Sequence, residues 1–166
     1  NVVGVASGDF SGWAMHMFWK GLEQGMTTAE ASRYYIKFRD EASDRGSLVH
    51  SIIEDTIEDG FAYPYDLPEQ PTEKLSELVD AYNGLGYVHA FQRFCEDFRP
   101  DFIEQESTVY GQTNPDSPHA FDYAGTTDFV ARIGGKTVVG DWKNTKSLHG
   151  SVAVQLAAAK YADMKA

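Results

Sequence analysis

The sequence contains a single cysteine, Cys95, so the chain cannot form an internal disulfide. One cysteine is also too few for a four-cysteine iron–sulfur cluster. Proteins of a reducing compartment rarely use disulfides, so the cysteine content favours an intracellular, cytoplasmic protein. We therefore expect neither a disulfide framework nor an iron–sulfur cofactor.

Long apolar runs and several well-known motifs are also missing. No stretch approaches the roughly 20 apolar residues of a membrane-spanning helix, and the start lacks the basic and apolar regions of a signal peptide. The G-x-x-x-x-G-K-[ST] phosphate loop and the G-x-S-x-G nucleophile elbow are absent. We expect no membrane partner, no nucleotide-hydrolysing motor and no elbow-type serine hydrolase.

Basic residues are scarce: 14 lysine and arginine residues face 25 acidic ones, and the net charge is −11. A plain nucleic-acid-binding module would show a basic footprint, which argues against that class. The deficit is uneven, however, because residues 129–166 hold six basic residues against two aspartates. Local contact with phosphate is therefore still compatible with the C-terminal segment.

The chain of 166 residues is 42% hydrophobic, which suits one globular domain. We expect a single domain over 1–166, mainly helical in 1–100 and built of a sheet plus a helix in 101–166. Because the sequence does not begin with Met and ends within a helical pattern, we also expect it to be cut from a longer protein at both ends.

Apolar residues at helical spacing predict helices over 10–22, 28–42, 48–59, 72–82 and 87–98, with a further helix starting near 151. Thr27 and Glu30 have the spacing of a capping box, and Ser47 and Thr72 are predicted helix caps. A strand is predicted over 101–111. Its Glu106 is interpreted either as an additional acidic residue at a site or as a solvated strand residue.

The segment 125–143 predicts a β-hairpin that carries the main site. Its residues alternate between two faces, and Gly134-Gly135 supplies the tight turn. Asp128 lies six residues before this turn and Asp141 six residues after it, so their rungs should be adjacent or identical. Lys143 shares the face of Asp141 because side chains on a strand alternate with period two.

Two carboxylates on one patch repel unless a proton or a cation lies between them. Oxygen ligands suit Mg²⁺ or Mn²⁺, and a nearby lysine can position an attacking water or stabilise developing negative charge. The alternative is a solvated strand face with cross-strand charge pairs. The apolar neighbours of Asp141 predict that it is partly buried, and buried acids are seldom unpaired, which favours the functional interpretation.

These segments resemble the PD-(D/E)XK nuclease superfamily, and within it the RecB-like exonucleases. That branch includes CRISPR-associated and phage-encoded members and the mitochondrial genome maintenance exonuclease. The resemblance covers residues 40–166 and is carried by GTTD at 125–128, VVGDWK at 138–143 and a G-[ST]-x-x-H match ending at His50. The branch also has Q-x-x-x-Y. Gln155 matches its glutamine, but Ala159 stands at +4 and the nearest tyrosine is Tyr161 at +6.

The resemblance implies a restriction-endonuclease-like α/β fold, with a mixed sheet flanked by helices and a helical N-terminal portion. It implies a metal-dependent deoxyribonuclease, an exonuclease acting on single-stranded DNA or DNA ends. The implied metal ligands are His50, Asp128, Asp141 and the Trp142 carbonyl, the implied catalytic residues are Asp128, Asp141 and Lys143, and the implied substrate contacts are Gln155 and Tyr161. The cofactor would be Mg²⁺ or Mn²⁺, and the imidazole favours Mn²⁺.

Other interpretations stay open at this point. By itself His50 is typical of a histidine hydrogen-bonded at the edge of a core. A non-catalytic DNA-binding or protein-interaction module on a decayed nuclease fold is the competing function, motivated by the displaced tyrosine and by the absence of a predicted strand after the last helix. A hydrolase of other phosphoesters is a third. Phage-encoded members of the branch leave room for a phage protein acting in the host cell, and the oligomeric state is not predicted.

Overall fold

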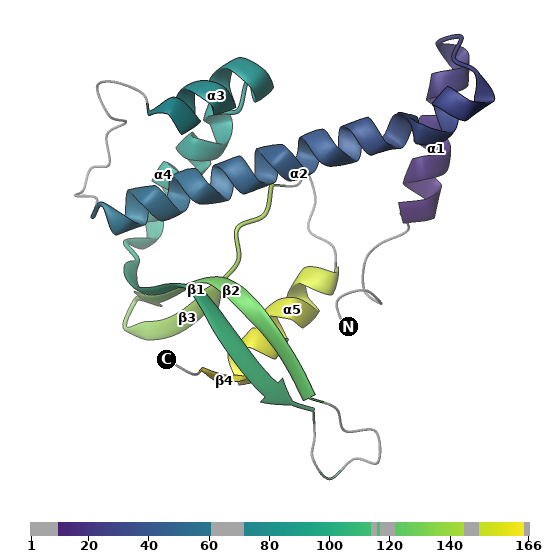
Figure 1. The fold of residues 1–166 in the computed structure, drawn as a ribbon. Coiled ribbons are helices and arrows are strands. Elements are labelled where there is room, and N and C mark those ends of the chain that lie inside the picture. Colours follow the sequence, from purple (N-terminus) through teal and green to yellow (C-terminus); the bar gives the residue numbers. More distant parts are fainter. Residues whose placement is uncertain (1–9, 61–71, 114–115, 117–121, 145–149, 165–166) are drawn as a thin grey trace.

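The computed structural model describes residues 10–60, 72–113, 116, 122–144 and 150–164 (Figure 1). Within these residues it is an α/β structure, as predicted, with five helices and four strands. The helices are α1 (Phe10–Glu23), α2 (Thr28–Glu58), α3 (Glu73–Tyr82), α4 (Leu85–Phe98) and α5 (Gly150–Tyr161). The strands are β1 (Asp101–Gln112), β2 (Asp122–Ile133), β3 (Lys136–Gly140) and β4 (Asp163–Met164).

The sheet has the order β3-β2-β1-β4, and each of its three strand pairs is antiparallel. The prediction of a mixed sheet is therefore wrong for the described residues. Neighbouring strands β1, β2 and β3 follow one another directly in the chain, and such successive strands pair antiparallel because no crossover separates them. Gly134 and Gly135 have φ values of +56° and +77°, which is the backbone of the predicted two-residue turn.

A strand follows the last helix, contrary to the expectation that none would. β4 pairs with β1 through Val109–Met164 and Tyr110–Asp163. Two residues are too few to show the alternation from which a strand is predicted, so the pattern carried no signal. One of the two arguments for a decayed fold is thereby removed.

Helix α2 is continuous over 31 residues, whereas two helices with a cap at Ser47 were predicted. A glycine inside a helix costs about 1 kcal/mol relative to alanine, which weakens the helix at Gly46 without breaking it. Burial of Val49, Ile52 and Ile53 just beyond that point offsets this cost. The capping box of Thr27 and Glu30 is confirmed at the start of the helix.

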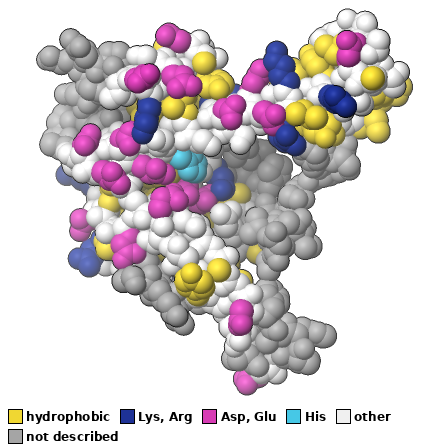
Figure 2. Space-filling view, viewed as in Figure 1, with side chains coloured by type: hydrophobic (Ala, Val, Ile, Leu, Met, Phe, Trp, Pro, Cys, Tyr) yellow, Lys and Arg dark blue, Asp and Glu magenta, His cyan; other side chains and the backbone are white. Residues whose placement is uncertain are grey.

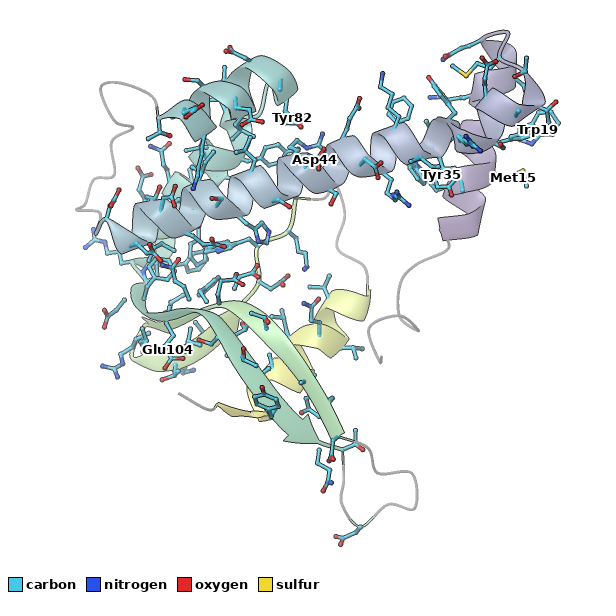
Figure 3. All side chains as sticks on the ribbon, in the orientation of Figure 1. Met15, Trp19, Tyr35, Asp44, Tyr82 and Glu104 are labelled. Atoms are coloured by element: carbon cyan, nitrogen blue, oxygen red, sulfur yellow. The ribbon has the colours of Figure 1, made fainter. Side chains whose placement is uncertain are left out.

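Helix α1 packs against the N-terminal half of α2, at the end of α2 far from α3 and α4 (Figure 1). The approach is close, since a Cβ added at Gly21 would lie 3.1 Å from Ala31. Trp19 and Met15 of α1 are 59% and 57% exposed (Figure 3). Among the described residues, every helix is too short or too polar to cross a lipid bilayer.

The core lies where α2, α3 and α4 meet. Its buried side chains are Val49, Ile52, Ile53, Leu75, Leu78, Val88, Phe91 and Cys95. The side chain of Trp142, just beyond β3, packs against this cluster. Its ring stacks on Phe129 with centroids 4.4 Å apart and meets Phe94 and Phe91 edge-on at 5.3 and 5.5 Å. Aromatic pairs of this kind fix the backbone of the residues on either side of Trp142.

Candidate active site

Three acidic residues gather at one level of the sheet, and we call this group the acidic rung. Phe129 pairs with Gly140, the last residue of β3, so Asp141 follows directly after the strand and is an electrostatic neighbour of Asp128. On the other side of β2, Gln105 pairs with Phe129 and Ser107 with Thr127, so Glu106 stands opposite Asp128. Strand β3 ends at Gly140, three residues earlier than predicted, and the Asp141–Lys143 segment rises from the sheet towards α2.

Thr127 holds the end of β3 in this register. Its side chain is 2% exposed, and its hydroxyl donates to the Gly140 carbonyl oxygen at 2.9 Å. The bond ties β2 to the last residue of β3, just where the chain leaves the sheet. The position of Asp141 beside Asp128 is thus set by β2 as well as by the turn.

His50 of α2 meets this rung from above. Its Nε2 lies 3.0 Å from the Trp142 carbonyl oxygen. Because a carbonyl can only accept, this nitrogen carries the proton. Its Nδ1 lies 3.6 Å from Asp128 Oδ2, too far for a hydrogen bond but close enough for an electrostatic interaction. The same Asp128 oxygen accepts the Trp142 N–H at 2.5 Å. His50 and Asp128 therefore hold the peptide groups on either side of Trp142.

Asp141 is the most buried acid at the site, with a side chain 6% exposed. The amide of Gln155, on α5, donates to Oδ1 at 3.1 Å. The ammonium group of Lys143 contacts Oδ2, but no hydrogen bond satisfies this buried oxygen. Oδ2 is thus held by the charge of Lys143 alone. The Lys143 side chain itself is 31% exposed and reaches solvent.

The carboxyl groups of this region are electrostatically crowded. Burial raises the pKa of Asp128, the bond from the Trp142 N–H lowers it, and the neighbouring Asp141 raises it again. The nearby His50 and Lys143 side chains act in the lowering direction. Burial, opposed by few cations, therefore leaves Asp128 harder to ionise than an ordinary aspartate. Such shifts are common where a carboxylate awaits a cation or a proton.

Glu106 shows a second raised pKa. The residue is exposed, and partial desolvation of its carboxyl is the largest cause, to which the carboxyl of Glu54 and the charge of Asp128 add. Glu54 also hydrogen-bonds the protonated form of Glu106. The backbone of Glu106 has φ of +48°, a left-handed conformation that is strained for a residue with a side chain. Strained residues of this kind cluster at functional sites, so Glu106 is best interpreted as part of this site.

Glu54 is the residue that sequence reasoning missed. It lies four residues after His50 on α2, so both side chains project from one face of the helix. That spacing was the available signal. Figure 2 shows a histidine below α2 with acidic side chains beside it, and Figure 3 shows polar side chains of α2 and of the sheet reaching towards one another.

The structure therefore brings six predicted site residues together: His50, Asp128, Asp141, Trp142, Lys143 and Gln155. Gln155 bonds Asp141, whereas it was predicted as a substrate contact. Tyr161 is the last residue of α5, and its side chain lies outside the described part of the structure.

The donor set suits a hard divalent ion, although the side chains are not gathered around one. Within the described ranges, no three His, Cys, Asp or Glu side chains are close enough to hold a metal ion as they stand. One observation nevertheless fits such an ion. Asp141 Oδ2 is buried without a hydrogen bond.

Comparison with known proteins adds no relative. No family model matches the chain, and no curated protein and no solved structure matches it. The resemblance to the RecB-like nucleases therefore rests on the sequence motifs alone.

Proposed function

We propose that this chain is a metal-dependent deoxyribonuclease with a restriction-endonuclease-like fold, related to the PD-(D/E)XK superfamily. The observation that carries the proposal is the convergence of Asp128, Asp141 and Lys143 with His50 and the Trp142 carbonyl. These groups come from α2, β2 and the segment after β3, so chance proximity along the chain does not explain their meeting. The number of these groups, the signs of their charges and their chemistry suit hydrolysis of a phosphodiester.

The order of elements supports the same proposal. A helix bearing His50 precedes three antiparallel strands, and the acidic rung lies where the second and third strands meet. Helix α5 then returns to the sheet, where the hydroxyl of Tyr123 donates to the Ala158 carbonyl at 3.0 Å, and β4 extends the sheet beside β1.

His50, Asp128, Asp141 and the Trp142 carbonyl would hold the divalent ion. When bound, the ion would neutralise phosphate charge and lower the pKa of a water molecule. The stacked ring of Trp142 keeps its carbonyl in place, and the Gln155 amide keeps the Asp141 carboxylate in place. Both groups are therefore oriented before the reaction begins, and such positioning lowers the activation barrier.

Lys143 is the group placed to act on the substrate. Its ammonium touches Asp141 at one end of the site and is partly exposed, so a phosphate oxygen or a water molecule can reach it. In hydrolysis the oxygen of water bonds to phosphorus, the bond to the leaving oxygen breaks, and that oxygen takes a proton. Lys143 would position the water and stabilise the negative charge that grows on the phosphate.

An exonuclease acting on single-stranded DNA or DNA ends is the form of this activity that the resemblance favours. The test is cleavage of end-labelled single-stranded DNA in Mn²⁺, in Mg²⁺ and in EDTA. Wild-type protein should shorten the DNA only with metal. Lys143→Ala should slow cleavage by about 100-fold or more, the scale for losing a group that stabilises transition-state charge. Lys136→Ala, at the exposed start of β3, is the matched control. Unchanged cleavage by Lys143→Ala would refute the assignment.

A non-catalytic DNA-binding or interaction module is the second candidate. The specific observation in its favour is that the described ligand groups bond to one another and that no three of them surround an ion as they stand. DNA retarded in a gel without shortening in either metal would support this module and contradict the nuclease.

A further inference from the structure

A cavity of about 150 Å³ lies next to the acidic rung, between α2, α4 and the segment after β3. Its wall is formed by Val49, His50, Ile53, Tyr87, Ala90, Phe91, Phe94, Trp142, Lys143 and Asn144. Ala90 is exposed on α4 and marks the rim where the cavity reaches the surface. Most of the wall is aliphatic or aromatic, as in sites that bind small molecules.

The cavity shares two residues with the proposed catalytic site. His50 and Lys143 belong to its wall and also contact Asp128 and Asp141. A group inside the cavity would therefore lie beside a phosphate held at Lys143. A nucleotide has this arrangement, because its base and its phosphate are joined through one sugar.

Asn144 gives this wall an unused pair of polar atoms. Both the oxygen and the nitrogen of its side-chain amide are buried, and neither has a hydrogen-bond partner. A buried amide without partners is unfavourable, and it offers one acceptor and two donors to whatever fills the space. The nitrogen lies against α2 at Gly46, 4.0 Å from where a Cβ would stand. The base edges of nucleic acids carry complementary donors and acceptors.

The size of the cavity limits what can enter. An apolar cavity of about 150 Å³ is known to accept a benzene ring, so one six-membered ring fits inside, whereas the second ring of a fused pair would stay at the open rim. Among DNA bases this favours the pyrimidines, whose single ring can be enclosed completely. The ring of Tyr87, on α4, lies in the wall and is a stacking partner for such a base. The guanidinium of Arg45, on α2, lies 5.9 Å from the centre of the Tyr87 ring.

We propose that this cavity holds one pyrimidine base of the DNA strand whose neighbouring phosphate is cleaved at Lys143. The identification of the ligand as part of DNA rests on the proposed nuclease function. The base enters past Ala90, stacks on the aromatic wall and bonds the Asn144 amide. The strand is thereby fixed relative to Asp141, and pyrimidine sequences are preferred.

The test measures binding rather than cleavage and is made in EDTA, so that it does not depend on metal or on catalysis. Saturation-transfer NMR is recorded on the full chain with thymidine 5′-monophosphate, deoxyadenosine 5′-monophosphate, 2-deoxyribose 5-phosphate and benzene. Stacking of one base corresponds to about 5- to 150-fold in affinity. We therefore expect thymidine monophosphate to bind at least 5-fold more tightly than the sugar phosphate and than the purine nucleotide.

Two substitutions on α4 localise the binding. Ala90→Trp fills the rim and should abolish the preference for thymidine monophosphate over the sugar phosphate. His89→Trp adds the same ring at a neighbouring exposed position outside the wall and should leave the preference intact. If Ala90→Trp does not fold, as judged by circular dichroism, Ala90→Leu narrows the same rim. Asn144→Leu should weaken thymidine monophosphate binding while leaving benzene binding unchanged.

Several results would overturn the proposal: equal affinity for thymidine monophosphate and the sugar phosphate, tighter binding of the purine nucleotide, or a preference that survives Ala90→Trp. Uptake of benzene without the nucleotide would show a packing gap in the core and would overturn it as well. Failure of DNA cleavage together with base-selective binding would reject the nuclease and keep the pocket. Cleavage without base-selective binding would reject the pocket and keep the nuclease.

Discussion

The Gln155 amide nitrogen donates to Asp141 Oδ1 at 3.1 Å and connects α5 to the acidic rung of the sheet. The Lys143 ammonium contacts the other oxygen of the same carboxylate. Asp141 is thus held from both sides, by a neutral donor and by a charge. We infer from this bond that Gln155 acts through Asp141 as a positioning residue, which differs from the substrate contact implied by the resemblance.

Removing this amide should weaken the proposed metal site. We expect Gln155→Ala to lower Mn²⁺ affinity and cleavage rate by about 10-fold or more, because groups that orient a ligand typically contribute 10- to 100-fold. Isothermal titration with Mn²⁺ and single-turnover cleavage measure the two effects. Val154→Ala, at a 51% exposed position on the same helix, is the control. A higher KM for DNA with unchanged Mn²⁺ affinity would instead make Gln155 a substrate contact.

Replacing Asp128 should have opposite effects on protein stability with and without metal. In EDTA, Asp128→Asn should be at least as stable as wild type, because the raised pKa of Asp128 shows that its charge is unfavourable in the folded protein. An asparagine oxygen can still accept the Trp142 N–H. With Mn²⁺ at 100 times its Kd, wild type should gain about 2.7 kcal/mol of unfolding free energy, and the variant should gain little. Thermal melts in EDTA and in Mn²⁺ measure both. An equal gain for the two proteins would exclude Asp128 as a ligand.

Cys95 should be chemically inert in the folded protein. Its side chain is fully buried, and burial raises the pKa of the thiol to about 12 from an ordinary value of 9.0. Because the folded state keeps its proton while the unfolded state loses it, unfolding free energy should fall as pH rises from 9 towards 12, by up to about 1.4 kcal/mol per pH unit. We expect no reaction with Ellman's reagent at pH 8 until denaturant is added. Prompt labelling of native protein would contradict the burial of this thiol.

Gly46 lies inside α2, and replacing it with alanine should stabilise the protein. The residue has an ordinary helical backbone, and an added Cβ would meet its nearest neighbour, Asn144 Nδ2, at 4.0 Å, an ordinary contact. We expect Gly46→Ala to raise the unfolding free energy by about 0.5–1 kcal/mol, the usual difference between the two residues in a helix. Urea unfolding followed by circular dichroism measures it. A loss of stability would show that α2 bends or breaks at this position.

The site was predictable where a local pattern sets geometry. Period-two alternation around the Gly134-Gly135 turn predicts that Asp128 and Asp141 lie near one another, and they do, although Asp141 lies just beyond the end of β3. Helical spacing places His50 on the flank of a buried face. The left-handed backbone of Glu106 was not predictable, since the strand pattern carries no sign of it. The orientation of Gln155 depends on how α5 packs on the sheet, which is decided by tertiary contacts. The continuity of α2 through Gly46 likewise depends on the core beneath its second half.

Gly140 is the position where any side chain should damage the site through packing alone. An added Cβ would lie 1.9 Å from Cζ of Phe129, whose ring is buried and stacked on Trp142. The ring cannot move without displacing Trp142, the residue between Asp141 and Lys143. We expect Gly140→Ala to destabilise the protein by about 1–3 kcal/mol, as overpacking does, and to reduce cleavage further in protein that is still folded. The double variant Gly140→Ala/Phe129→Leu frees space for the methyl group and should recover part of the stability. If Gly140→Ala alone were as stable as wild type, Phe129 would not be locked against Trp142, and the route from core packing to catalytic geometry would be wrong.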